Sequence, residues 1–119
     1  MVPAVVSVHS FTPVFKGFER PWHVGILWNR DDRLARPLMQ RLAALGLTVG
    51  DNQPYSGKDR HGHTMPRHVE DAGIPHALIE IRQDLIDTRH GAEEWADRLY
   101  NVLAAIFADP ALRQLKPPA

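Results

Sequence analysis

Apolar side chains gather in three short segments of the chain that predict β-strands. Residues 4–8 are rich in valine and predict a buried strand, which is followed by a loop with proline and glycine. Residues 22–29 (WHVGILWN) and 74–84 (IPHALIEIRQD) predict two further strands. Side chains alternate across a strand, so the last segment has two faces: Leu78, Glu80 and Arg82 on one, and Ala77, Ile79 and Ile81 on the other.

Two longer segments repeat apolar side chains with the period of an α-helix. Leucines recur at i, i+4, i+8 and i+11 from Leu34, with Asp31 or Asp32 as the expected N-cap and Gly46 as the terminator. A second amphipathic helix is expected over residues 92–107, with a stripe of Trp95, Leu99, Val102, Leu103 and Ile106. Both stripes predict helices that face a hydrophobic core rather than a cofactor.

The segment between these helices is polar. Residues 50–63 (GDNQPYSGKDRHGH) have no hydrophobic period and predict a long loop, which in a compact domain is usually functional or mobile. A short helix is expected to begin at Thr64 and to end near Gly73. Strands that alternate with helices indicate the α/β class, in which ligands bind at the carboxyl ends of strands. His9 and Glu80 both lie at such ends.

Composition narrows the classes of partner. Fourteen basic and fourteen acidic side chains cancel, and no basic stripe interleaves with aromatic residues, which argues against nucleic acid. The absence of cysteine excludes disulfides, thiolate nucleophiles and cysteine-based zinc sites. No stretch approaches the roughly 18 apolar residues of a membrane span, and no signal-like segment opens the chain. We therefore expect a single domain over residues 1–119, in a cytoplasmic protein with no membrane partner.

Glu80 and Arg82 stand out because charged groups within an aliphatic strand must be paired, solvated or functional. One interpretation is a structural ion pair, or a strand face that is exposed at the rim. The other is a general base beside an arginine that holds a substrate carboxylate through two hydrogen bonds. The sequence leaves both interpretations open.

Histidines are the only nitrogen ligands that the side chains offer to a metal. A single histidine at a strand end, such as His9, is more often structural than metal-binding, and a catalytic zinc needs three protein ligands. His61, His63 and His68 form an alternative local group, although HGH in a glycine-rich loop is more often merely solvated. The spacing of these histidines does not decide whether they are structural or bind a metal.

The segment DNQPYSG, residues 51–57, brings an amide, a phenol and a hydroxyl together. It is either a turn in which Asn52 and Ser56 bond their own backbone, or a loop that contacts substrate. Tyr55 is its least turn-like residue.

Four motifs in the order VVSVHSFTPVF, RPWHVGILWNRD, GDNQPYSG and HALIEIRQDLI resemble the N-formylglutamate amidohydrolase family, over residues 5–86. The family consists of zinc-dependent hydrolases. The resemblance implies a mixed-sheet α/β/α sandwich of the phosphorylase/hydrolase-like, zinc carboxypeptidase-type fold. Members of the family are longer, and the chain resembles their C-terminal half, so we expect a fold that is incomplete on its N-terminal side.

The resemblance also implies roles for individual residues. His9 would be a zinc ligand, and Glu80 would be the general base for the zinc-bound water. The residues expected to hold an acidic substrate are Arg82, Arg20, Asn52, Tyr55 and Ser56.

The activity implied is hydrolysis of the N-formyl amide of N-formyl-L-glutamate, or of a related N-acyl amino acid, to formate and glutamate, a step of histidine degradation. The other metal ligands of the family belong to its N-terminal half, so activity is expected to need an N-terminal partner chain or a homodimer. The alternative is a non-catalytic, truncated α/β module that binds small carboxylates or a partner chain through an open sheet edge.

Overall fold

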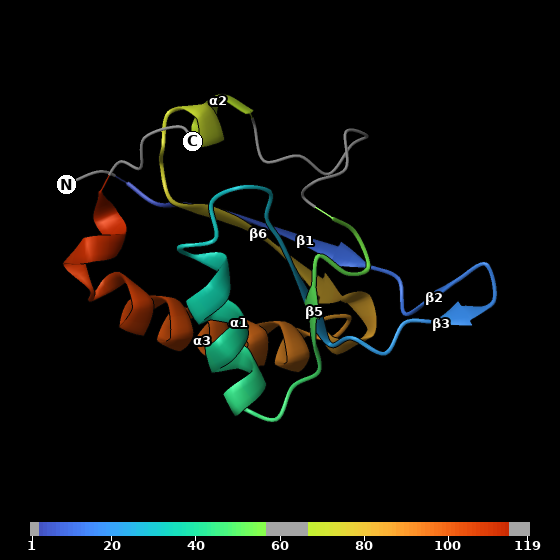
Figure 1. Ribbon diagram of the computed structural model, residues 1–119. Helices are drawn as coiled ribbons and strands as arrows, with labels where there is room; N and C mark the ends of the chain where they lie inside the picture. Colours follow the sequence, from blue (N-terminus) through green and yellow to red (C-terminus); the bar gives the residue numbers. More distant parts are fainter. Residues whose placement is uncertain (1–2, 57–66, 115–119) are drawn as a thin grey trace.

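A four-stranded mixed sheet is the centre of the computed structural model, which describes residues 3–56 and 67–114 (Figure 1). In spatial order its strands are β1 (Val5–Phe11), β6 (His76–Arg82), β4 (Val24–Leu27) and β5 (Val49–Asp51). β1 is parallel to β6, β6 is antiparallel to β4, and β4 is parallel to β5. The prediction of an α/β fold around a mixed sheet is confirmed.

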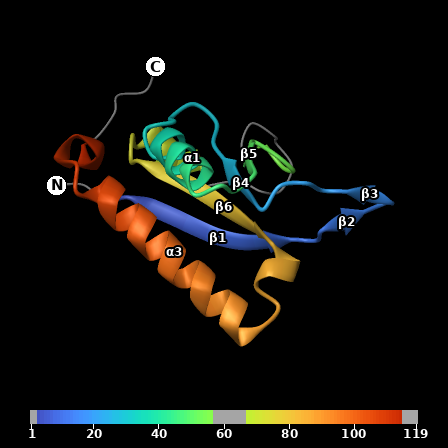
Figure 2. The same ribbon diagram turned by 90° about the horizontal axis from the view of Figure 1, so that it is seen from below.

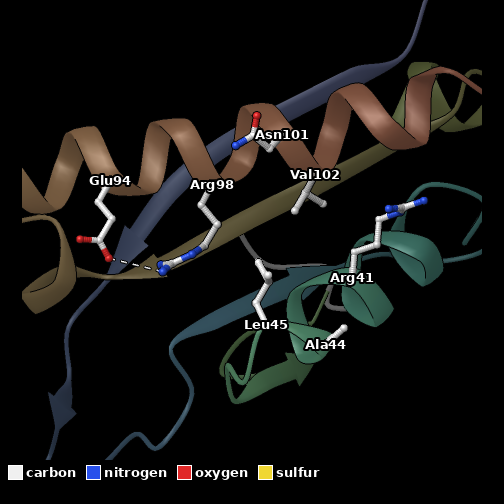
Figure 3. A pocket seen from close by; sticks show the side chains of 7 residues that line it. All are labelled: Arg41, Ala44, Leu45, Glu94, Arg98, Asn101 and Val102. Atoms are coloured by element: carbon white, nitrogen blue, oxygen red, sulfur yellow. Dashed lines mark hydrogen bonds and ion pairs between the residues drawn. The ribbon is translucent and has the colours of Figure 1, made fainter.

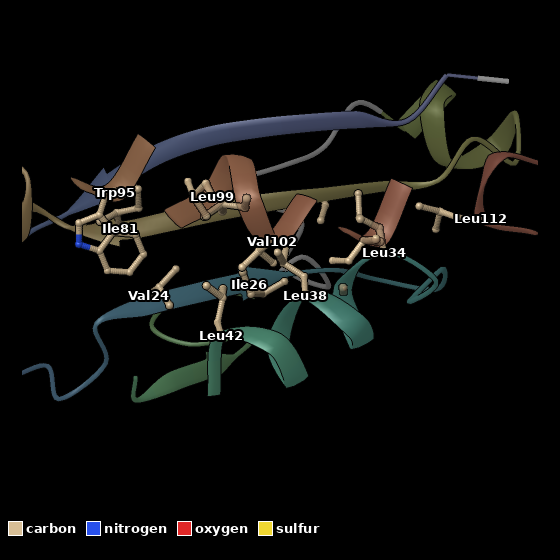
Figure 4. Packing of buried hydrophobic residues seen from close by; sticks show 14 residues of the cluster. Val24, Ile26, Leu34, Leu38, Leu42, Ile81, Trp95, Leu99, Val102 and Leu112 are labelled. Atoms are coloured by element: carbon tan, nitrogen blue, oxygen red, sulfur yellow. The ribbon is translucent and has the colours of Figure 1, made fainter. Parts of the chain in front are cut away.

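Two long helices, α1 (Ala35–Ala44) and α3 (Arg89–Phe107), cover one face of this sheet (Figures 1 and 2). Their apolar stripes pack against alternate side chains of β4 and β6, as predicted from the helical period (Figure 4). Burial of each large aliphatic side chain stabilises such a core by about 1.5–3 kcal/mol. The buried cluster comprises Val24, Ile26, Leu34, Ala35, Leu38, Leu42, Ala77, Ile79, Ile81, Trp95, Leu99, Val102, Ile106 and Leu112.

The opposite face, called the loop face below, is covered differently in the described ranges, so the expected three-layer sandwich is not confirmed. Both long helices of the described ranges lie on the other face. Residues 51–56 lie over β4 and β5, where Gln53 lies directly above the glycines of these strands. The short helix α2 (Arg67–Asp71) contacts β6 through Glu70 and His76. A loop and one helical turn therefore occupy the place of a second layer.

β1 corrects the prediction of a buried first strand. It is longer than expected and lies at the edge of the sheet, so Val8, His9 and Ser10 are exposed. Valine favours the extended backbone at an edge as well as in the middle of a sheet. A run of valines therefore predicts a strand without fixing its place in the sheet.

A β-hairpin follows β1 where the sequence predicted only a loop. Its strands are β2 (Val14–Phe15) and β3 (Phe18–Glu19), and it projects from the body of the molecule (Figure 1). The two turn residues, Lys16 and Gly17, both have positive φ angles, 51° and 79°. That conformation matches the twist of a two-residue hairpin, and glycine adopts it at little cost.

The ends of α1 differ from the prediction at one side only. Leu34 is the N-cap and provides no side-chain hydrogen bond, so the expectation of Asp31 or Asp32 as N-cap is wrong. Asp31 instead accepts a hydrogen bond from the backbone nitrogen of Arg33 at 3.1 Å. At the other end Gly46, with φ 85°, terminates the helix as predicted.

The remaining boundaries shift by a few residues. α3 begins earlier than expected, because Thr88 is its N-cap and accepts a hydrogen bond from the backbone nitrogen of Gly91 at 3.0 Å. β5 takes the first residues of the predicted polar loop. Two short 3₁₀ turns, Gln83–Leu85 and Pro110–Arg113, follow β6 and α3. In the part of the chain that the structure describes, no helix is long and apolar enough to cross a membrane.

Candidate functional site

His9 and Glu80 meet on the loop face of the sheet. The β1–β6 ladder pairs them directly, and paired residues of strands about 4.8 Å apart point to the same side. That side faces away from the helices, because the neighbours of Glu80 along β6 belong to the helical core. His9 is exposed, whereas Glu80 is only 1% exposed. The structure therefore brings together the predicted metal ligand and the predicted general base.

Gly25 lies on the other side of Glu80, on β4. A Cβ atom at Gly25 or at Gly50 would overlap the backbone carbonyl oxygen of Gln53. Both glycines therefore let residues 51–56 lie directly on the sheet beside Glu80. Sequence reasoning missed this role, although an isolated glycine within a strand is a known signal of close backbone approach.

Asn52 holds this loop to β4. Its side-chain oxygen accepts a hydrogen bond from the backbone nitrogen of Trp28 at 2.9 Å. The backbone nitrogen of Asn52 donates to the carbonyl of Ile26 at 2.9 Å. Its φ angle of 55° is the left-handed conformation that asparagine tolerates in turns. The left-handed φ of Asn52 fits a turn, whereas these two hydrogen bonds join Asn52 to the backbone of β4 and its following residue rather than to its own segment. Contact of Asn52 with substrate stays a prediction.

Arg20 occupies a cage of aromatic rings at the carboxyl end of β1. Its guanidinium lies 4.8 Å from the ring centre of Phe15, 5.1 Å from that of Tyr55 and 5.8 Å from that of Phe11. It donates hydrogen bonds to the Tyr55 hydroxyl at 3.2 Å and to the carbonyl of Thr12 at 3.2 Å. Arg20 is 7% exposed and forms no ion pair with a carboxylate of the described ranges. No carboxylate of the described ranges therefore neutralises the charge of Arg20.

Arg82 has a different environment. Its Nε and Nη2 donate to the two carboxylate oxygens of Asp84 at 2.7 and 3.2 Å, and its Nη1 to the carbonyl of Trp22 at 3.5 Å. The guanidinium of Arg82 lowers the pKa of the Asp84 carboxyl. Arg82 thus pairs with Asp84 rather than with Glu80, two positions earlier on the strand. These contacts favour a structural role, and substrate binding by Arg82 stays a prediction.

Tyr55 and Ser56 both lie half-buried at the end of the segment over the sheet. Tyr55 joins this segment to the base of the hairpin through its hydrogen bond with Arg20. Ser56 is the last described residue before the gap in the described ranges. Contact of this segment with substrate stays a prediction.

The predicted metal ligands form an incomplete set in the described ranges. Within residues 3–56 and 67–114, no group of three histidine, aspartate or glutamate side chains is placed to hold a metal. His61 and His63 lie outside the described residues, as does the side chain of His68. A catalytic zinc takes three protein ligands, so the described side chains alone do not fit this ion.

A second polar cluster ties the start of β6 to α2. His76 is 1% exposed; its Nε2 lies 3.0 Å from a carboxylate oxygen of Glu70, and its Nδ1 lies 2.8 Å from the carbonyl of Ile74. Arg30 donates to the other oxygen of Glu70 at 2.7 Å. Burial alone would raise the pKa of Glu70, but the hydrogen bonds from Arg30 and His76 outweigh it, and the pKa is lowered. This cluster joins α2 to the start of β6, at the opposite end of the strand from Arg82.

A cavity of about 530 Å³ lies on the helical side, between the end of α1 and the middle of α3 (Figure 3). Leu45 and Val102 contribute its apolar surface, and Arg41 and Arg98 lie at its rim. Arg98 stacks on the ring of Trp95 at 4.7 Å. The sheet separates this cavity from His9 and Glu80, so it is not part of the candidate site.

Comparison with known proteins agrees with the four sequence motifs. Residues 1–87 match a family model described as N-formylglutamate amidohydrolase. The crystal structure of a gene product from Agrobacterium tumefaciens is similar with a TM-score of 0.82 and 34% identity, over 90% of this chain and 42% of that chain. The chain thus spans less than half of that relative, and no curated protein matched it. The family match covers most of the chain and includes His9, Gly25 and Glu80, and the chain therefore belongs to the N-formylglutamate amidohydrolase family, which is a family of hydrolases.

Proposed function

We propose that this chain supplies the base and the substrate-binding cation of a hydrolase that cleaves the N-formyl amide of N-formyl-L-glutamate, or of a related N-acyl amino acid. The observation that carries the proposal is the direct pairing of exposed His9 with buried Glu80 on the loop face. Amide hydrolysis needs a proton acceptor at the place where water attacks. We propose Glu80 as that acceptor.

Glu80 is proposed to act first as a base and then as an acid. It takes a proton from water as the water oxygen bonds to the formyl carbon. When the carbon–nitrogen bond breaks, Glu80 returns that proton to the leaving amine, which gives formate and the free amino acid.

Arg20 is the better candidate for holding the acidic substrate. A guanidinium recognises a carboxylate by charge and by paired hydrogen bonds. The guanidinium of Arg82 is already bonded to Asp84, whereas that of Arg20 is held only by neutral groups of the described residues. Tyr55, together with Ser56 and Asn52, would form the adjoining wall of the binding site.

Zinc is proposed as the cofactor, with His9 as one ligand and the others from outside the described residues. A supplementary chain, either an N-terminal partner or a second copy, is proposed to complete the site. The proposed setting is histidine degradation in the cytoplasm. The second candidate function is a non-catalytic module that binds small carboxylates, for which the guanidinium of Arg20, held only by neutral groups of the described residues, is the supporting observation.

Release of formate from N-formyl-L-glutamate tests the proposal. Glu80→Gln keeps the size of the side chain but removes the base, and is expected to lower kcat by about 100- to 10,000-fold. Arg20→Lys is expected to raise KM, because lysine cannot form paired hydrogen bonds to a carboxylate. Glu93→Gln, an exposed change on α3, is the matched control and is expected to keep full activity.

Two results would contradict the proposed function. If Glu80→Gln keeps full activity, Glu80 is not the general base. A wild-type chain that binds N-formyl-L-glutamate but releases no formate, with zinc present and the partner supplied, would leave the non-catalytic module as the correct function.

A further inference from the structure

The two edges of the sheet differ in their protection. β5, at one edge, has three residues and is overlain by the segment that follows it, through Gln53. β1, at the other edge, has seven residues with the sequence VVSVHSF. Natural sheets guard long edges with lysine, proline, bulges or a covering segment. The strand β1 contains no lysine or proline, and its ladder with β6 runs without a bulge.

The backbone of β1 has hydrogen-bonding groups directed away from β6. The nitrogen of Val5 donates to the carbonyl of Pro75 at 2.9 Å, so this amide faces β6. Amides alternate sides along an extended strand, which turns those of Val6, Val8 and Ser10 toward the open edge. Val8, at the centre of the strand, is 54% exposed. The edge therefore offers a row of backbone donors and acceptors beside an exposed apolar side chain.

The two faces of the sheet define the chemistry of a strand that would fit there. On the helical face, Val6 packs against the core and Val8 extends it outward. On the loop face, the neighbouring side chains are Ser7 and His9. A matching strand would alternate apolar residues beside Val8 with polar residues beside His9.

We propose that β1 is the docking edge for a β-strand of a further polypeptide, which extends the sheet beside His9. The relative from Agrobacterium tumefaciens supports this occupant, because more than half of that chain lies outside the part that resembles this fold. The inference rests on the proposed function and deepens it, since the added strand brings new side chains next to the candidate metal ligand. Pairing with a second copy of β1 is the competing outcome.

The experiment uses that remaining part of the relative as the probe. It is co-expressed with residues 1–119 of this chain, so that neither needs to be purified alone. Light scattering after size-exclusion chromatography is expected to show a one-to-one complex. Hydrogen exchange at the amides of Val6, Val8 and Ser10 is expected to slow at least about tenfold in the complex, because these amides become hydrogen-bonded.

Variants at the edge separate strand pairing from other contacts. Val8→Pro removes one outward amide, and Val8→Lys places a charge at the centre of the edge; both are expected to abolish the complex. Circular dichroism shows whether each variant is folded. If Val8→Pro does not fold, the result with Val8→Lys decides whether the edge is needed for the complex. Tyr100→Lys, at a side chain on α3 that is 72% exposed, is the matched control and is expected to keep the complex.

Three results would overturn the inference: no complex, a complex in which exchange in β1 is unchanged, or a chain that dimerises alone through a protected β1. The measurements use no substrate and no activity. A complex with a protected β1 that releases no formate would contradict the proposed function and leave the docking edge standing.

Discussion

The two faces of the sheet are built by the same strands but for different tasks. On the helical face, Ile79 is fully buried among aliphatic side chains of both helices. On the loop face, its neighbour Glu80 lies between His9 and a strand position with no side chain, Gly25. One face thus derives its stability from close apolar packing, and the other gives up such packing to bring polar groups together. The alternation of a strand lets each task be altered separately, and four experiments with substituted chains test that separation.

The largest expected effect on stability belongs to the helical face. Ile79→Ala is expected to lower the free energy of unfolding by about 2–5 kcal/mol, because it leaves a cavity in the core. Glu80→Gln, one residue away, is expected to change it by less than about 1.5 kcal/mol. Urea denaturation of both variants measures the difference. Equal losses would show that the two faces are not separate.

Gly25→Ala tests the contact between the loop and the sheet. The added methyl group would overlap the carbonyl of Gln53, and backbone must move, so a loss of about 1–3 kcal/mol is expected. Gly17→Ala is the control: its Cβ would meet no atom within 4 Å, and only the strain of its positive φ remains, about 1 kcal/mol. Thermal unfolding compares the two. A smaller loss at Gly25 would mean that the loop yields readily.

Glu70→Gln is expected to cost about 1–2 kcal/mol at pH 7, because Arg30 and His76 lose a charged acceptor. Folding lowers the pKa of Glu70, so its contribution is fully present above the unfolded value of about 4.3 and is lost as the pH falls through the folded value. Urea midpoints measured between pH 7 and pH 3 are expected to converge for wild type and variant. A gap that widens toward low pH would contradict this sign.

Asp84→Asn has the smallest expected effect. Both side chains of the Arg82 pair reach solvent, so the loss is expected to be about 0.5 kcal/mol and to shrink in high salt. The KM of Asp84→Asn also tests which arginine, Arg82 or Arg20, holds the substrate. If KM falls in this variant because the guanidinium of Arg82 is released, Arg82 rather than Arg20 holds the substrate carboxylate.

The sequence predicted best those elements in which local pattern and tertiary packing agree. The helical face was predicted in detail, because the stripe of α3 and the alternation along β6 both encode burial directly. The hairpin was missed although Lys16–Gly17 carries its turn signal, because Pro13 and the short flanking strands read as loop. Edge and central strands have similar compositions, so β1 was misplaced.

The sequence suggested residues for the candidate site but not their arrangement, and their roles stay predictions. His9 and Glu80 were both expected at strand ends, yet their adjacency depends on the order β1–β6–β4–β5, which no local pattern reveals. The cage of Arg20 required the unforeseen hairpin, since Phe15 belongs to it. The pairing of Arg82 with Asp84 depends on the turn after β6, which places the two side chains together.

The contact of Gln53 with the bare backbone at Gly25 and Gly50 has a consequence for how this site can diverge. The nearest contact at both glycines is main chain on main chain, so the position of Gln53 above the strands depends little on the rotamer or size of a side chain. If the proposed function holds, substitutions that change its substrate specificity are expected around Tyr55 and Phe15 rather than at these glycines. The contact of Gln53 with the two glycines is expected to stay the same across variants with different specificities.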